Sequence, residues 1–98
     1  MAGYLIAELE ITDPEGFERY RPLAAASIAR HGGRYLVRGG TAEAREGAEP
    51  GRLVVLEFPS LDQARTFYES EDYQAALKLR LASSTGRVML VEGLSSPS

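Results

Sequence analysis

Residues 52–63, RLVVLEFPSLDQ, carry a strand directly followed by the start of a helix, and this stretch decides the fold. The segment Arg52–Phe58 is rich in β-branched and large apolar residues, which is typical of a buried strand. Pro59 ends that strand, and Ser60 with Gln63 forms a capping box, a pattern that begins many helices. We therefore expect the chain to leave a sheet at residue 58 and to enter a helix soon afterwards.

Similar signals extend in both directions from this stretch. Strands are expected at residues 4–11, 34–38, 52–58 and 87–92. A first helix is expected to begin at Thr12 or Asp13, through a capping box with Glu15 or through Asp13 followed by proline, and to end at Gly32. A second helix carries Ala64, Phe67 and Tyr68, is interrupted at Ser70, and continues to Arg80.

The resulting order of elements is β-α-β-β-α-β, the ferredoxin-like α+β plan, with the second helix broken. Right-handed crossovers place the helices on one side of a four-stranded antiparallel sheet. No repeat or linker divides the sequence, so we expect one domain at residues 1–94 and a disordered tail at residues 95–98.

Composition excludes several classes of function. The 98 residues include no cysteine and one histidine, so a thiolate nucleophile is excluded and a metal site is not expected. The net charge of −3 argues against a nucleic-acid partner, because phosphate contacts need a basic surface. The N-terminus, MAGYLIAELEITD, has neither a basic segment nor a long apolar one. We therefore expect no membrane anchor and a cytoplasmic location.

The face of the sheet opposite the helices is expected to be apolar. Alternation along the strands assigns one set of side chains to the helices: Leu5, Ala7, Leu9, Tyr35, Val37, Val54, Leu56, Phe58, Met89 and Val91. It assigns the other set to an outer face: Tyr4, Ile6, Glu8, Leu36, Arg38, Leu53, Val55, Glu57, Val88, Leu90 and Glu92.

Seven of these eleven outer residues are apolar or aromatic, whereas a solvated face is mostly polar. Burying seven such side chains is worth roughly 10–20 kcal/mol, against an association cost of about 4–15 kcal/mol. The sequence therefore predicts a homodimer joined sheet to sheet. The alternative is a monomer whose outer face is covered by residues 39–51.

Three separated stretches, HGGRYLVRGG at 31–40, RLVVLEFPS at 52–60 and TGRVMLVEG at 85–93, resemble domain-of-unknown-function family 1330. The likeness extends over about Gly3 to Gly93. It implies a fold of the dimeric α/β-barrel superfamily and a sheet-to-sheet dimer. Relatives in that superfamily include cofactor-free monooxygenases, lactone isomerases and stress-response proteins, and they often use a pocket between sheet and helices. They share no catalytic residue, so the resemblance assigns none here.

His31 is the candidate general acid or base, since the ordinary pKa of histidine lies near 6.5. The structural alternative is that it bonds a free carbonyl at the end of the first helix. The glycines around it fit no phosphate-binding pattern, because none precedes a helix.

Arginines and tyrosines are the candidate ligand-binding residues. Arg34 and Arg38 are expected on the same side of their strand, where a guanidinium suits a carboxylate. Alternatively, Arg34 forms an ion pair with Glu8 or Glu57. The two glutamates are expected to lie close together, because the first and third strands are expected to be parallel. Arg80 is the polar group best placed to reach a pocket between helices and sheet.

Aromatic residues, Tyr20, Tyr35, Phe67, Tyr68 and Tyr73, are expected to line such a pocket or to form an ordinary core. The functional hypothesis is a homodimer that binds or converts a small aromatic or carboxylated metabolite without a bound cofactor. In it His31 moves protons, Arg38 or Arg80 holds an anionic group, and Tyr35 with Tyr68 contacts the apolar part. The alternative is a non-enzymatic dimeric binding or stress-response module.

Overall fold

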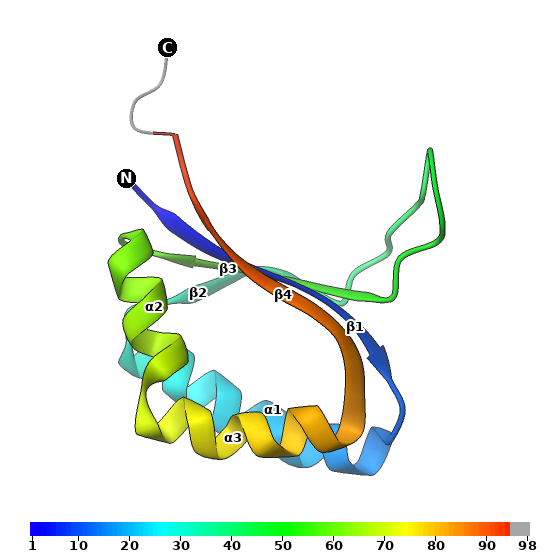
Figure 1. Ribbon diagram of the computed structural model, residues 1–98, viewed down its shortest axis with the longest axis horizontal. Coiled ribbons are helices and arrows are strands. Elements are labelled where there is room, and N and C mark those ends of the chain that lie inside the picture. The colour runs from blue at the N-terminus through cyan, green and yellow to red at the C-terminus, as the bar shows by residue number, and fades with distance from the viewer. Residues whose placement is uncertain (95–98) are drawn as a thin grey trace.

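Residues 1–94, which the computed structural model describes, fold into a four-stranded antiparallel sheet with three helices on one of its faces (Figure 1). The elements in chain order are β1 (Gly3–Ile11), α1 (Pro14–Arg30), β2 (Arg34–Arg38), β3 (Arg52–Phe58), α2 (Leu61–Glu69), α3 (Glu71–Ser83) and β4 (Ser84–Glu92). The strand order is β2-β3-β1-β4. The ferredoxin-like α+β order and the break in the second helix are thereby confirmed, while the tail at 95–98 lies outside the described residues.

Serine hydroxyls begin two of the helices, and the sequence predicts the first of these caps, at Ser60. The Ser60 hydroxyl accepts the backbone N–H of Gln63 at 3.0 Å and caps α2. The Ser70 hydroxyl accepts the backbone N–H of Tyr73 at 3.3 Å and caps α3. Ser70 is thus the residue that separates the two helices, because its extended backbone ends α2 and its side chain starts α3.

The start of α1 differs from the predicted capping box. Asp13 occupies the cap position and Pro14 follows it, but the Asp13 side chain makes no capping hydrogen bond. The backbone N–H groups of Thr12 and Asp13 instead donate to the carbonyl of Ser83, at 2.8 and 3.1 Å. The start of α1 is therefore held by the end of α3. At its other end, Gly32 adopts a φ of 77°, the left-handed conformation expected after a helix.

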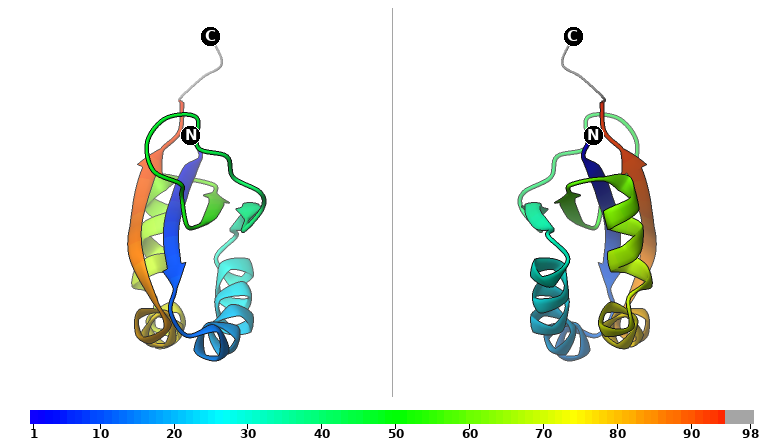
Figure 2. Two further views of the ribbon diagram at one scale, coloured as in Figure 1. Left: turned by 90° about the vertical axis from the view of Figure 1, so that its right-hand side faces the viewer. Right: turned by 90° about the vertical axis from the view of Figure 1, so that its left-hand side faces the viewer.

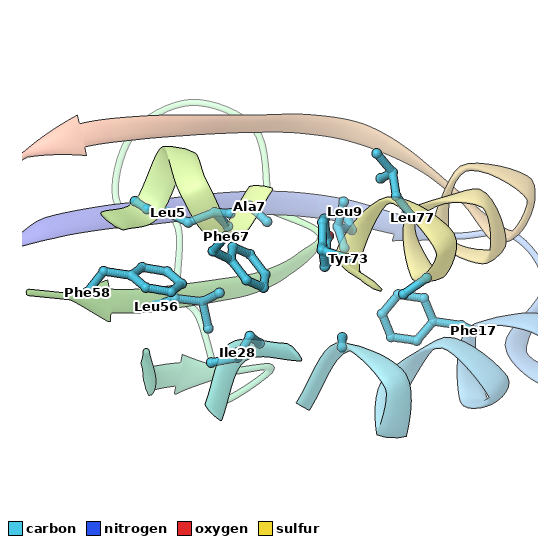
Figure 3. Close-up of a cluster of buried hydrophobic side chains, with 13 residues drawn as sticks. Leu5, Ala7, Leu9, Phe17, Ile28, Leu56, Phe58, Phe67, Tyr73 and Leu77 are labelled. Carbon is cyan, nitrogen blue, oxygen red and sulfur yellow. The ribbon is translucent and has the colours of Figure 1, made fainter. Parts of the chain in front are cut away.

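The core lies between the sheet and the helices (Figure 3). Leu5, Ala7 and Leu9 point from β1 toward the helices, and Leu56 and Phe58 do so from β3. They meet buried side chains of the helices, which include Phe17, Ile28, Phe67, Tyr73 and Leu77. The Phe67 ring lies 5.0 Å from Phe58 and 4.4 Å from Tyr73, between centroids, so it links the sheet to α3.

Two strands present their side chains differently from the predicted alternation. A β-bulge in β2 between Tyr35 and Val37 shifts the register, so that Val37 faces outward and Arg38 lies opposite Val54, on the helix side. In β4, Val88 and Leu90 pack against the core, and Met89 and Val91 are exposed. The assignments of Val37, Arg38, these four β4 residues and Glu92, which is in phase with Leu90, were therefore wrong. Arg34 and Arg38 also do not share a side of β2, because Arg34 lies opposite Glu57 on the outer face. Pairing with β1, in which Leu5 faces Leu90 and Ala7 faces Val88, determines the β4 faces.

The predicted approach of Glu8 to Glu57 is also wrong, because β1 and β3 are antiparallel. Glu8 lies opposite Leu53 and Glu57 lies opposite Tyr4, toward opposite ends of the pair. Each glutamate has an arginine partner instead: Arg34 Nε lies 2.7 Å from Glu57, and Arg87 Nε lies 3.6 Å from Glu8.

The outer face of the sheet is free of helices in each view (Figure 2). The arm of residues 39–51 projects away from the helices at one end of the sheet (Figure 1). Val37, Met89 and Val91 remain exposed, so the arm does not cover this face. None of the helices in residues 1–94 has the length and apolar character needed to span a membrane.

Candidate functional site

A small cavity of about 40 Å³ lies between the sheet and the helices. Apolar side chains of the core form most of its walls, among them Leu9, Phe17 and Val88. The polar part of the lining consists of tyrosines and arginines: Tyr20, Arg21, Tyr35, Arg38, Arg52, Tyr73 and Arg80. Within residues 1–94, no aspartate or glutamate belongs to this lining. The volume suffices for a few water molecules or a carboxylate group, but is well below the roughly 150 Å³ of a cavity that holds benzene.

Arg80 is the most deeply buried charged side chain of the site. It comes from α3 and is only 6% exposed. Its Nε is buried without a hydrogen-bond partner in the described part of the chain. No carboxylate of residues 1–94 lies within 4.0 Å of its guanidinium. Buried charges are normally paired, so an unpaired guanidinium beside a cavity is a candidate anion-binding group.

Arg52 approaches the cavity from the sheet. It is the first residue of β3 and shares the helix-facing side with Val54 and Leu56. Its guanidinium lies 5.6 Å from the centre of the Phe17 ring, and its Nε is also buried without a partner among residues 1–94. The site therefore holds one buried arginine, Arg80, and one half-buried arginine, Arg52, and each has a buried Nε without a partner among residues 1–94.

Arg38 and Tyr35 form the edge of the site on β2. The bulge brings Arg38 to the helix side, where its guanidinium lies 4.6 Å from the centre of the Tyr35 ring. Arg38 is exposed and Tyr35 is half-buried. Burial raises the pKa of the Tyr35 hydroxyl, and the nearby charge of Arg38 opposes that rise.

Tyr20 and Tyr73 place a pair of hydroxyls at the cavity. Their oxygens are 2.7 Å apart, and either hydroxyl can be the donor. Burial, followed by the neighbouring Tyr73, raises the pKa of Tyr20, while the charge of Arg80 lowers it. Tyr20 is therefore neutral at ordinary pH, and its hydroxyl lies within the electrostatic reach of Arg80.

The exposed members of the lining show where the cavity meets solvent. Arg21 on α1 and Arg38 on β2 are exposed, whereas Arg80 and Tyr73 are buried. The cavity therefore opens between α1 and β2. Arg21 is engaged with Glu18 on its own helix, at 2.9 Å.

Two of the predicted site residues do not line the cavity. His31 follows the last residue of α1, and its Nδ1 lies 2.8 Å from the Ser27 carbonyl, as the structural alternative predicts. Its ring meets the edge of Phe67 at 5.9 Å. Tyr68 packs on Tyr73 at 5.5 Å. The catalytic role of His31 and the ligand contact of Tyr68 stay predictions.

The structure brings together Tyr35, Arg38 and Arg80, three of the five predicted site residues, and adds Arg52 and Arg21 to them. Arg52 has a signal in the sequence, because it alternates with Val54, Leu56 and Phe58 and so belongs to the helix-facing set. Arg21 has no such signal, since a charged residue on a helix is usually solvated.

Solved structures with this arrangement define the class of protein as a ferredoxin-like α+β domain. A protein of unknown function from Rhodopseudomonas palustris superposes with a TM-score of 0.78 at 16% identity, covering 97% of this chain and 84% of that one. SnoaB, a cofactor-independent oxygenase from Streptomyces nogalater, gives 0.63 at 18% identity, covering 97% and 95%. A dimeric ferredoxin-like protein of unknown function from Thermobifida fusca gives 0.57 at 14% identity, covering 94% and 91%.

The family follows from a match over nearly the whole chain. Residues 2–94 match the model of the domain of unknown function DUF1330, and the chain belongs to this family. Comparison with curated proteins found no match.

Proposed function

We propose that this protein is a sheet-to-sheet homodimer in which each subunit binds a small aromatic or carboxylated metabolite without a bound cofactor, with only the polar end of the ligand inside the cavity of about 40 Å³. The observation that carries the proposal is the interior cavity, walled by apolar side chains and supplied with arginines and tyrosines. Concave apolar sites with a few convergent polar groups are the usual form of small-molecule sites. Arg38 or Arg80 would hold the anionic group, and Tyr35 would contact the apolar part.

The outer face of the sheet supports the dimer. Tyr4, Ile6, Leu53 and Val55 lie in its central strands, and Val37, Met89 and Val91 extend it to both edges. This set again contains seven apolar or aromatic side chains, but four of them are already half-buried within one chain, so association would gain only part of the free energy argued from the sequence.

The charged residues of that face already have partners within one chain. Glu57 pairs with Arg34, and Glu8 pairs with Arg87. A second subunit would therefore cover no unpaired charge in these positions, which lowers the desolvation penalty of association.

The dimer is tested by light scattering coupled to size-exclusion chromatography at micromolar concentration. The wild-type chain is expected to have twice the monomer mass. Val55→Arg places a charge in the centre of the outer face and is expected to give monomers. Leu81→Arg, at an exposed position of α3, is the control and is expected to remain dimeric. A monomeric wild-type chain would refute this part of the proposal.

Conversion of the ligand is a separate matter from its binding. In the proposal, His31 moves protons and Tyr68 contacts the ligand. Against a catalytic role, the Nδ1 of His31 is already bonded to the Ser27 carbonyl and the ring lies outside the cavity lining. This observation favours the second candidate, a non-enzymatic dimeric binding or stress-response module.

A metabolite screen by thermal shift tests the binding proposal, because a ligand selective for the folded state raises its stability by mass action. Each hit is then incubated with wild type and with His31→Ala. Turnover that disappears in the folded variant supports conversion, turnover that persists removes His31 from the mechanism, and binding without turnover supports the binding module. A complete absence of hits would contradict the proposed pocket.

A further inference from the structure

The polar groups that line the cavity have a surplus of hydrogen-bond donors. Four arginines belong to the lining, and no acidic side chain of residues 1–94 does. A guanidinium offers five N–H donors and no acceptor. An occupant of the cavity therefore has to supply acceptor atoms, and a negative charge would match its surroundings.

The surplus of hydrogen-bond donors is most clearly located at Arg80. It is only 6% exposed, and its buried Nε has no partner in the described residues. The side chain is nearly buried, so in the free protein its charge can meet little more water than the cavity holds. An anion in the cavity would supply the missing partner.

Arg52, on the opposite wall of the cavity, also has an Nε without a hydrogen-bond partner in the described part of the chain. Arg80 belongs to the helical layer and Arg52 to the sheet, and both line the same cavity. The buried Nε of Arg52 likewise has no partner within residues 1–94. Two positive groups around one cavity repel each other, and an anion between them attracts both and so offsets that repulsion.

The tyrosine pair adds a donor without a charge. One of the hydroxyls of Tyr20 and Tyr73 donates to the other, at 2.7 Å between oxygens. The second hydroxyl then keeps its proton for another acceptor. The donors available to an anion at Arg80 therefore include charged guanidinium groups and a neutral tyrosine hydroxyl.

We propose that the ligand of this cavity is a small carboxylic acid, whose carboxylate binds between the guanidinium groups of Arg80 and Arg52. The inference rests on the proposed function, because it names the ligand class for the same site. A carboxylate is planar and accepts two parallel N–H bonds from one guanidinium, and its size suits a cavity of about 40 Å³. The body of the ligand extends toward the opening between α1 and β2, beside Tyr35 and Arg38.

Isosteric acid and amide pairs test the charge requirement on the full-length protein. Acetate with acetamide and benzoate with benzamide differ in charge but hardly in shape, and inorganic phosphate serves as a second kind of anion. Titration calorimetry gives the affinities, and the NMR signals of the arginine Nε–H groups report the location. In at least one pair, the acid is expected to bind at least tenfold more tightly than its amide, with shifts of the Arg80 and Arg52 signals.

Substitutions then assign the preference to Arg80. Arg80→Met is expected to remove the preference for the acid, and Arg80→Lys to retain part of it. Lys78→Met, at an exposed position of the same helix, is expected to bind as the wild type does.

If compounds of the panel bind, three outcomes would overturn the inference: equal affinity for acid and amide, tighter binding of phosphate than of either acid, or an unchanged preference in Arg80→Met. An amide or other uncharged compound that binds in the cavity at least as tightly as the acids would leave the proposed function standing while refuting the carboxylate. Absence of binding by every compound of the panel would refute the inference, and the broader metabolite screen would then decide the proposed function.

Discussion

Replacing Arg80 with methionine is expected to make the ligand-free protein more stable. The guanidinium is only 6% exposed and its Nε has no partner among residues 1–94. Leaving a buried charge without its partner typically destabilises a protein by about 3–5 kcal/mol. Methionine removes that charge and retains the apolar contacts of the side-chain stem.

The expected size of the effect follows from two opposing contributions. Removing the unpaired charge recovers about 3–5 kcal/mol. Losing the guanidinium enlarges the cavity by roughly 50 Å³, which costs about 1 kcal/mol at about 24 cal/mol per Å³. The free energy of unfolding should therefore rise by about 2–4 kcal/mol, and Tm by at least roughly 8 °C for a domain of this size.

Thermal and urea unfolding of ligand-free protein measure this effect, with both proteins at one concentration because a dimer unfolds in a concentration-dependent way. Lys78→Met is the control, since it removes an exposed charge from the same helix and should change stability by less than about 0.5 kcal/mol. An Arg80→Met protein that is less stable than the wild type would refute the reasoning, because Arg80 would then be a satisfied structural residue.

Three further changes have defined outcomes. Val55→Arg should convert the dimer to monomers in light scattering, since Val55 lies on the central strand β3 of the outer face. The pKa of Tyr20 is raised above 10, the ordinary pKa of tyrosine, so above pH 10 the unfolded chain releases a proton that the folded chain keeps. The wild type should therefore lose stability as the pH rises through this range. Urea titrations between pH 9 and 11 should show a smaller loss of stability for Tyr20→Phe. Gly39→Ala should weaken carboxylate binding in calorimetry, because a Cβ there would collide with the Arg52 guanidinium. Gly47→Ala shares the positive φ but has open space around it, so it should leave binding unchanged and lower stability by only about 1 kcal/mol.

Much of the fold could be predicted because its signals are local. The serine caps at Ser60 and Ser70 act within three or four residues, and the structure forms both of them. The apolar character of the outer face was also predicted correctly, although several of its members were not. Along β4 the run Val88–Val91 is apolar at every position, so alternation carries no information about which side chains turn inward.

The site depended on features that local patterns do not contain. Arg38 was expected on the outer face, and a bulge of one residue in β2 moved it to the cavity. The alternation of its strand places Arg52 on the helix-facing side. A charged residue is not expected there from the sequence, because the sequence does not show that this side contains a cavity. Arg80 was selected from the sequence, yet its lack of a partner is visible only when the neighbouring elements are in place.

The sequence by itself determined the order of strands and helices, the ends of most elements and the presence of an apolar sheet face, because caps, turns and side-chain periodicity act over a few residues. The tertiary structure alone decided the register of β2 and β4, the antiparallel pairing that separates Glu8 from Glu57, and the convergence of Arg52 and Arg80 on one cavity. These depend on contacts between residues that are far apart in the chain. A charge becomes a candidate binding group here through burial without a partner, and burial is a property of the whole fold.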